Sequence, residues 1–177
     1  RYPIHSVKAL YHKNSSNMSL IADVRINNQY IRVINNHFET TNVNAYRGII
    51  TAPDKSLKIR AKAVKNLILQ MKDNNRKRAI QADSIHAEIQ RSPYPVIVCG
   101  DFNDTPASYT YHRVKKGLTD GFQDVGNGYQ YTFRQLYRLW RIDYVFYSES
   151  LKGQDCFSPD VSYSDHNMVV WRGCVKN

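Results

Sequence analysis

Residues 95–103 read Pro-Val-Ile-Val-Cys-Gly-Asp-Phe-Asn and decide how the rest of the sequence is interpreted. The first part is a run of β-branched residues that stops at Gly100, which is typical of a central strand buried on both faces. Asp101 and Asn103 follow directly, and in an extended chain they would project on the same side. The stretch therefore predicts a carboxylate and an amide at the end of a buried strand.

Asp101 and Asn103 together suit chemistry with a hard cation and a phosphate. A carboxylate can bind Mg²⁺ or take a proton from water, and an amide can donate a hydrogen bond to a phosphate oxygen. Asp and Asn after a strand glycine are also typical of an ordinary turn. This motif alone leaves both interpretations open.

Strands are predicted upstream of this stretch. Residues 18–26 alternate apolar and polar side chains, the pattern of a half-buried strand. A polar turn at 27–29 separates them from a second such run at 30–38, so the two should pair as an antiparallel hairpin. Residues 7–11 form a third, weaker candidate strand.

Two helices are predicted between the hairpin and the central strand. From residue 56 to residue 71 the apolar positions recur at spacings of four, three, four and three, which indicates an amphipathic helix. Asp73-Asn74-Asn75 favours a break, and a second helix is expected over residues 79–89. The apolar positions of the first helix are Leu57, Ala61, Val64, Ile68 and Met71.

The remaining pattern completes one domain over residues 1–177. Residues 141–147 and 167–172 are strand-like, with a Ser/Asp/Pro-rich loop between them. The order of strands, helices and further strands predicts an α+β fold, a layered α/β sandwich. The chain is 42% hydrophobic, and no apolar run approaches the roughly 20 residues of a membrane span, so none is expected within these residues.

Positive charge is concentrated in the first half of the chain, and the net charge is +10. Between residues 55 and 78 there are nine basic residues and one acidic residue. Lys58, Lys62 and Lys65 share one face of the predicted helix and are candidate contacts for a polyanion such as DNA or RNA. The alternative is a solvated helix face whose lysines serve solubility.

Three further polar residues are candidates for a site. Asp143 lies inside an apolar strand and needs a partner, because an unpaired buried carboxylate is costly. His166 in Ser-Asp-His is one candidate partner, and a carboxylate at its ring would favour a cationic imidazole that can hold a phosphate. Arg141 is the other candidate, and the sequence leaves the choice open. His37 ends the predicted hairpin strand.

Four motifs follow one another along the chain: Asn-Asn-His at 35–37, Gly-Asp-Phe-Asn at 100–103, Arg-Ile-Asp-Tyr at 141–144 and Ser-Asp-His at 164–166. In this order they resemble the endonuclease/exonuclease/phosphatase superfamily. Its members include DNase I-like nucleases, abasic-site endonucleases, inositol-polyphosphate phosphatases, neutral sphingomyelinases and deadenylases. The likeness runs from about residue 1 to residue 172.

The resemblance implies a DNase I-like four-layer α-β-β-α sandwich with a metal-dependent phosphoesterase site at one sheet edge. Carried over by motif, Asp101 would orient or deprotonate the attacking water, and Asn103 would hold the scissile phosphate. Asp165 would support Mg²⁺, with Mn²⁺ as the alternative ion. His166, oriented by Asp143, would stabilise the phosphate in the transition state.

His37 matches the histidine that assists at the phosphate in the DNase I-like branch. The implied reaction is in-line attack of water on a phosphodiester or phosphomonoester, without a covalent intermediate. An alternative of another class is a non-catalytic module that binds phosphate or nucleic acid through the basic segment 55–78.

One departure from the family pattern concerns its N-terminal half. Complete members carry there a Glu that is the principal metal ligand, whereas no Glu precedes Glu39 in this chain. The chain therefore resembles the C-terminal portion of a family domain that lacks part of its N-terminal half. We expect weak Mg²⁺ binding and little hydrolysis by these residues alone. We also expect an open sheet, covered either by a second copy in a homodimer or by a missing N-terminal segment.

Overall fold

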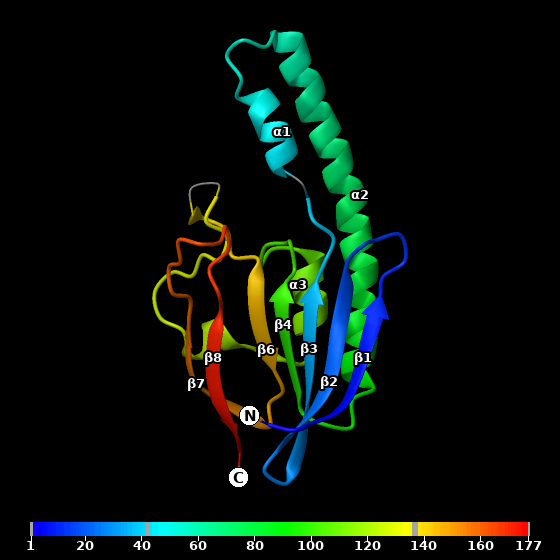
Figure 1. Ribbon diagram of the computed structural model, residues 1–177, viewed down its shortest axis with the longest axis vertical. Helices are drawn as coiled ribbons and strands as arrows, with labels where there is room; N and C mark the ends of the chain where they lie inside the picture. Colours follow the sequence, from blue (N-terminus) through cyan, green and yellow to red (C-terminus); the bar gives the residue numbers. More distant parts are fainter. Residues whose placement is uncertain (1, 42, 136–137, 177) are drawn as a thin grey trace.

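Six strands form one mixed sheet, and two more form a separate antiparallel pair (Figure 1). The computed structural model describes residues 2–41, 43–135 and 138–176. Its elements are β1 (Ile4–Tyr11), β2 (Met18–Ile26), β3 (Gln29–His37), α1 (Val43–Ile50), α2 (Leu57–Gln90), β4 (Val96–Asp101), α3 (Tyr109–Lys115), β5 (Thr119–Asp120), α4 (Gly121–Val125), β6 (Asp143–Tyr147), β7 (Leu151–Phe157) and β8 (Val170–Val175).

The large sheet has the strand order β1-β2-β3-β4-β6-β5. β1, β2 and β3 pair antiparallel, β3 and β4 pair parallel, and β4 pairs antiparallel with β6. The predicted hairpin of β2 and β3 is confirmed, and Asn27 at its turn has a φ of 54°, a left-handed conformation that asparagine tolerates. β4 lies between β3 and β6, so the decisive stretch forms a central strand, as predicted.

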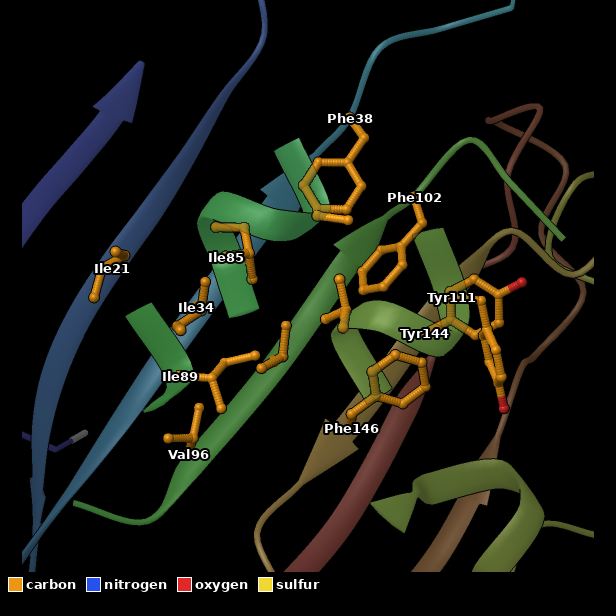
Figure 2. Packing of buried hydrophobic residues seen from close by; sticks show 13 residues of the cluster. Ile21, Ile34, Phe38, Ile85, Ile89, Val96, Phe102, Tyr111, Tyr144 and Phe146 are labelled. Carbon is orange, nitrogen blue, oxygen red and sulfur yellow. The ribbon is translucent and has the colours of Figure 1, made fainter. Parts of the chain in front are cut away.

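Helices α2 and α3 cover one face of this sheet. Their buried apolar residues pack with those of β2, β3, β4 and β6 into the main core, part of which Figure 2 shows. On the other face a smaller cluster joins the sheet to the β7–β8 pair through Tyr147, Leu151 and Trp171. The described residues thus form three layers: helices, a six-stranded sheet and a two-stranded sheet. This arrangement confirms the predicted layered α+β class.

The two-stranded sheet leaves part of the inner sheet face uncovered. An open groove there is lined by residues of both sheets, among them Val33, Ile97, Cys99 and Trp171. The prediction that the central strand is buried on both faces therefore holds on the helix side, where Val98 is 0% exposed, and only partly on the other side, where Ile97 and Cys99 are half-buried.

The predicted break at residues 73–75 is wrong, because α2 runs without interruption from Leu57 to Gln90. Asn74 donates from Nδ2 to the Thr40 carbonyl oxygen at 2.7 Å, and Asn75 accepts a hydrogen bond from Arg78. Asparagine disfavours helix interiors because its side chain competes for nearby backbone groups. Here Asn74 bonds to a carbonyl outside the helix and Asn75 to the Arg78 side chain, so the helix continues.

The first half of α2 projects beyond the sheet together with α1 (Figure 1). We call residues 43–71, which comprise α1, the connecting turn and the first half of α2, the projecting hairpin. The two helices contact each other, and Arg60 donates from Nε to the Ile50 carbonyl oxygen at 2.7 Å. The amphipathic helix predicted over residues 56–71 is present as the first half of α2, yet its apolar positions are exposed. The part of the chain that the structure describes contains no helix that could span a membrane.

A strand was missed in the predicted loop between residues 147 and 167. β7 spans Leu151–Phe157 and pairs antiparallel with β8. Its inward positions include Gly153, where a Cβ would lie 2.7 Å from the Tyr147 hydroxyl oxygen. Because a glycine replaces an apolar side chain at one inward position, the alternation that marks a strand is weak in this segment.

Candidate active site

Three candidate residues stand side by side at one edge of the large sheet. His37 ends β3 and is in register with Asp101 at the end of β4, which is in register with Asp143 at the start of β6. Figure 1 shows β3 and β4 ending together where β6 begins. His37 Nε2 lies 3.8 Å from Asp101 Oδ2. We call His37, Asp101 and Asp143 the catalytic row.

Each of the first two residues of the row is followed by an anchored phenylalanine. Phe38 and Phe102 are both 0% exposed, and their ring centroids are 5.0 Å apart (Figure 2). The Phe38 N–H donates to the Asp101 carbonyl oxygen at 3.0 Å. These contacts hold the strand ends together, so that His37 and Asp101 can remain near the surface at fixed positions.

Gly100 allows β3 and β4 to approach closely beside the row. Its φ is +124°, and a Cβ built there would lie 2.0 Å from the Asn36 carbonyl oxygen. Since no side chain fits at that distance from a backbone atom, the glycine of the Gly-Asp-Phe-Asn motif is required by packing. It brings Asp101 into line with its neighbours.

His166 joins the row from the loop that precedes β8. Its Nδ1 lies 2.9 Å from Asp143 Oδ2, and its Nε2 lies 4.0 Å from Asp101 Oδ2. The ring also packs against Phe133, with centroids 5.1 Å apart. Arg141, the other candidate partner of Asp143, is buried and pairs instead with Asp120. Of the two alternatives that the sequence left open, the structure selects the Asp143–His166 pair.

Asn103 adopts the turn geometry that the sequence left open as an alternative to an extended chain. Its φ is 50°, and its backbone N–H donates to Asp101 Oδ1 at 2.7 Å. The side-chain amide donates from Nδ2 to the Phe38 carbonyl oxygen and to Asp101 Oδ2, both at 3.0 Å. Both amide hydrogens are therefore used, and in this conformation Asn103 orients Asp101 and has no N–H free for a phosphate.

The electrostatics of the cluster follow from burial and from the close approach of two carboxylates. Burial raises the pKa of Asp101 to about 7, and the nearby charge of Asp143 adds to the effect. The hydrogen bond to Asp143 raises the pKa of His166, against an opposing contribution from burial. The hydrogen bond to Asp143 thus favours the protonated form of His166, with Nδ1–H donated to Asp143.

Among the described residues, Asp101, Asp143 and His166 form a group that could hold a metal ion. Each offers a ligand atom, and these atoms lie within 4.8 Å of one another. Mg²⁺ is usually bound by one or two carboxylates together with waters and substrate phosphate oxygens, so two carboxylates fit it in number. Asp165, the predicted metal-supporting residue, is exposed and lies outside this group. Glu39, the first glutamate of the chain, is not a member of this group either, and its side chain is bonded to Ser15 and Lys77.

Sequence reasoning missed two residues that position the site. Arg78 is 2% exposed and donates to Asp104 Oδ2 at 3.1 Å and to the Glu39 carbonyl oxygen at 2.9 Å, so it ties the segments after β3 and β4 together. The sequence did contain a signal, because Arg78 lies four and seven positions before Ala82 and Ile85 and therefore on the same, core-facing side of α2. Thr132 accepts hydrogen bonds at Oγ1 from the backbone N–H groups of Ile142 and Asp143.

A cavity of about 370 Å³ opens near the catalytic row. It is lined by Asn103 and Ile142, which are close to the row in the chain, and not by the row itself. Arg78, Asn103 and Asp165 line its polar side. Its apolar wall comes from α1, α2 and the segments before β6, and consists of Val43, Met71, Phe133, Trp140 and Ile142. Lys58, Lys62 and Lys65 are exposed on the first half of α2 and are not among its lining residues.

Solved structures with the same fold are readily found. An endonuclease/exonuclease/phosphatase from Bacteroides vulgatus aligns with a TM-score of 0.71 and 16% identity, over 99% of this chain and 67% of that chain. A humanized D. rerio TDP2 aligns with a TM-score of 0.68 and 16% identity, over 98% and 67%. A mannosyl-6-phosphatase from Bacteroides thetaiotaomicron aligns with a TM-score of 0.62 and 16% identity, over 98% and 67%.

These likenesses show the fold, and the chain spans about two thirds of the length of these three structures. No curated protein sequence matches the chain significantly. A family model for the endonuclease/exonuclease/phosphatase family matches residues 1–166, which include the catalytic row and His166. The chain therefore belongs to the endonuclease/exonuclease/phosphatase family.

Proposed function

We propose that this chain carries the proton-transfer and phosphate-binding half of a phosphate-ester hydrolase that uses a divalent cation, Mg²⁺ or Mn²⁺. The observation that carries the proposal is the catalytic row of His37, Asp101 and Asp143 with His166 beside it. Two carboxylates and two imidazoles at one sheet edge are suited to activating water and to stabilising a phosphate that gains negative charge.

Asp101 is the residue that we propose as the proton acceptor. A general base is most effective when its pKa lies near the working pH, and burial raises the pKa of Asp101 to about 7. Asn103 fixes both carboxylate oxygens of Asp101 through its backbone and side-chain N–H groups. A bound divalent cation would lower the pKa of the attacking water and offset negative charge on the phosphate.

His166 is the residue that we propose for the phosphate. Because its Nδ1–H is held by Asp143, a protonated ring presents Nε2–H on the side of Asp101, 4.0 Å away. A phosphate oxygen at that place would meet a charge-assisted donor, which is about twice as strong as a neutral one. His37, on the opposite side of Asp101, would assist there, and Asp165 at the cavity mouth would support the cation through water.

The cavity near the row would take the alcohol part of the substrate. Its wall includes the aromatic side chains of Phe133 and Trp140, and the latter is 40% exposed and so accessible to a ligand. Arg78 also lines the cavity, but its guanidinium already pairs with Asp104. The cavity thus favours a phosphate ester whose alcohol carries an apolar or ring-shaped group.

We also propose that these residues alone bind the cation weakly and turn over slowly. Among the described residues the possible metal-binding group contains two carboxylates and no glutamate. The apolar groove between the sheets would be covered by a further segment of the protein or by a second copy of the chain. Light scattering separates these cases, since a homodimer doubles the mass of the dissolved chain.

The test of the proposed function is release of the alcohol from a panel of phosphate monoesters and phosphodiesters, at high protein concentration, with Mg²⁺ or Mn²⁺. We expect slow turnover that requires the cation and falls at least about 10²-fold in Asp101→Asn and in His166→Ala, the usual scale for losing a general base or a preorganised charge. Turnover that both variants retain would refute the assigned roles. Phosphate binding without any cation-dependent turnover would favour a non-catalytic module.

A further inference from the structure

The projecting hairpin exposes a continuous apolar row along the first half of α2. Leu57 is 80% exposed and Ile68 is 59% exposed, while Val64 and Met71 are 39% and 37% exposed. Residues three and four positions apart lie on one face of a helix, so these side chains form a single stripe of about 20 Å at 1.5 Å per residue. We call Leu57, Ala61, Val64, Ile68 and Met71 the apolar row.

A row of cations lies directly beside the apolar row. Lys58, Lys62, Lys65 and Lys72 each follow one of its members by one position, which places them about 100° further round the helix. All four are exposed. Among the ion pairs of the described residues none involves these four lysines, so their charge is available to a partner.

The position of the two rows in the fold makes them accessible. Figure 1 shows the first half of α2 and α1 standing clear of the sheet and of the strand ends around them. The half-buried Arg60 and Leu67 lie on another side of the helix, and Arg60 bonds to α1. The apolar row is therefore not the surface through which the hairpin holds itself together.

Three kinds of partner could bind the apolar row and the lysines beside it, and their chemistry distinguishes them. A second copy of this hairpin would bring equal positive charges together at short range, which is unfavourable. Single-stranded nucleic acid binds by stacking bases on aromatic side chains, whereas every member of the apolar row is aliphatic. Aliphatic side chains next to lysines match a surface with an apolar interior and anionic headgroups.

We propose that the projecting hairpin docks on the surface of a membrane that contains anionic lipids. The apolar row enters the boundary between headgroups and acyl chains, and Lys58, Lys62, Lys65 and Lys72 contact lipid phosphates. Lysines near an anionic surface are attracted to it, and burial of the aliphatic side chains adds to the binding. None of the residues altered in the test below lines the cavity near the catalytic row, so the docking can hold or fail separately from the proposed hydrolase function.

The test is co-sedimentation of the chain with vesicles of phosphatidylcholine that contain phosphatidylglycerol at about 30% or none. We expect binding to the anionic vesicles that is at least about tenfold tighter than binding to the neutral ones. The double variant Leu57→Ser/Ile68→Ser should weaken it at least about tenfold. The triple variant Lys58→Glu/Lys62→Glu/Lys65→Glu should abolish it.

Ile80→Ser is the matched control, since Ile80 is 66% exposed on the same helix but lies outside the apolar row. It should bind as the parent chain does. Because all the altered side chains are exposed, each variant should unfold in urea at the parent's midpoint. Equal binding to both kinds of vesicle overturns the proposal. So does anionic binding that survives the serine pair, because it would then be purely electrostatic, as it would be with a nucleic acid.

Discussion

The two halves of α2 share one apolar periodicity and have opposite surroundings. In the second half Ala82 and Ile85 are 0% exposed and pack in the main core, whereas in the first half Leu57 and Ile68 are 80% and 59% exposed. Periodicity reports that a helix has an apolar face, because it follows from the spacing of side chains on a regular backbone. Whether another layer covers that face depends on tertiary structure, and the same pattern here serves as core in one half and as surface in the other.

The comparison predicts its largest effect at the isoleucines of the two halves. Ile85→Ala should lower the free energy of unfolding by about 4 kcal/mol, the scale for emptying a buried aliphatic site. Ile68→Ala should change it by less than about 0.5 kcal/mol, as is usual for a surface substitution. Urea unfolding followed by far-UV circular dichroism measures both. A cost of more than about 1.5 kcal/mol for Ile68→Ala would show that the apolar row is packed in solution.

Two arginines of α2 that are two residues apart show the same contrast between a buried and an exposed side chain. Arg78 is 2% exposed and bonds to Asp104, Thr41 and the Glu39 carbonyl, while Arg76 is exposed. Arg78→Ala leaves Asp104 without its cation and should cost about 3 kcal/mol, the scale for removing one partner of a buried pair.

Arg76→Ala is the control and should cost less than about 0.5 kcal/mol in the same urea experiment. Arg78→Lys should recover little of the loss, because an ammonium cannot reproduce the four directed hydrogen bonds of the guanidinium. Equal small effects at both positions would show that the network around Arg78 contributes nothing to stability.

Local patterns and motifs in the sequence predicted parts of both the fold and the candidate site. The alternation of apolar and polar residues predicted the β2–β3 hairpin, and the β-branched run predicted that β4 is a central strand. Such patterns are readable because the spacing of side chains on one face follows from backbone geometry. The motif order led to Asp101, Asp143 and His166, which the structure brings together.

What the sequence could not supply depends on contacts between distant segments. The continuity of α2 depends on the bond from Asn74 to Thr40, and β7 is recognisable only beside β8. Asn103 was expected to face a phosphate, yet its amide bonds to Phe38 and Asp101, residues whose approach is set by packing of β3 on β4. Arg78 was counted with the surface cations because charge alone does not report burial.

Asp101 and Asp165 offer the same contrast between a buried and an exposed carboxylate. Burial raises the pKa of Asp101 from 3.8 to about 7, so ionising it opposes folding. The stability that its neutral form contributes is complete below pH 3.8 and is lost as the pH rises toward 7. In EDTA, Asp101→Asn should therefore raise the free energy of unfolding at pH 8 by up to about 2 kcal/mol.

At pH 4 the gain should vanish, because the native carboxyl group is then neutral as well. Asp165→Asn, the exposed control, should stay within about 0.5 kcal/mol of the parent at both pH values. Destabilisation by Asp101→Asn at pH 8 would mean that the hydrogen bonds from Asn103 outweigh the cost of burying the charge.

The smallest effect concerns the proton on His166, which the half-buried Asp143 influences more than the adjacent, exposed Asp165. The hydrogen bond to Asp143 is the main reason that the pKa of His166 is raised, and the charge of Asp165 is the weakest contribution. Asp143→Asn should lower the pKa of His166 clearly, and Asp165→Asn should lower it less. Titration of the imidazole ring protons by NMR measures both, with His166→Gln to assign the resonance. If the two substitutions lowered the pKa equally, the 2.9 Å contact between Nδ1 and Asp143 would not be a persistent hydrogen bond in solution, and His166 would lack the fixed orientation that its role at the phosphate requires.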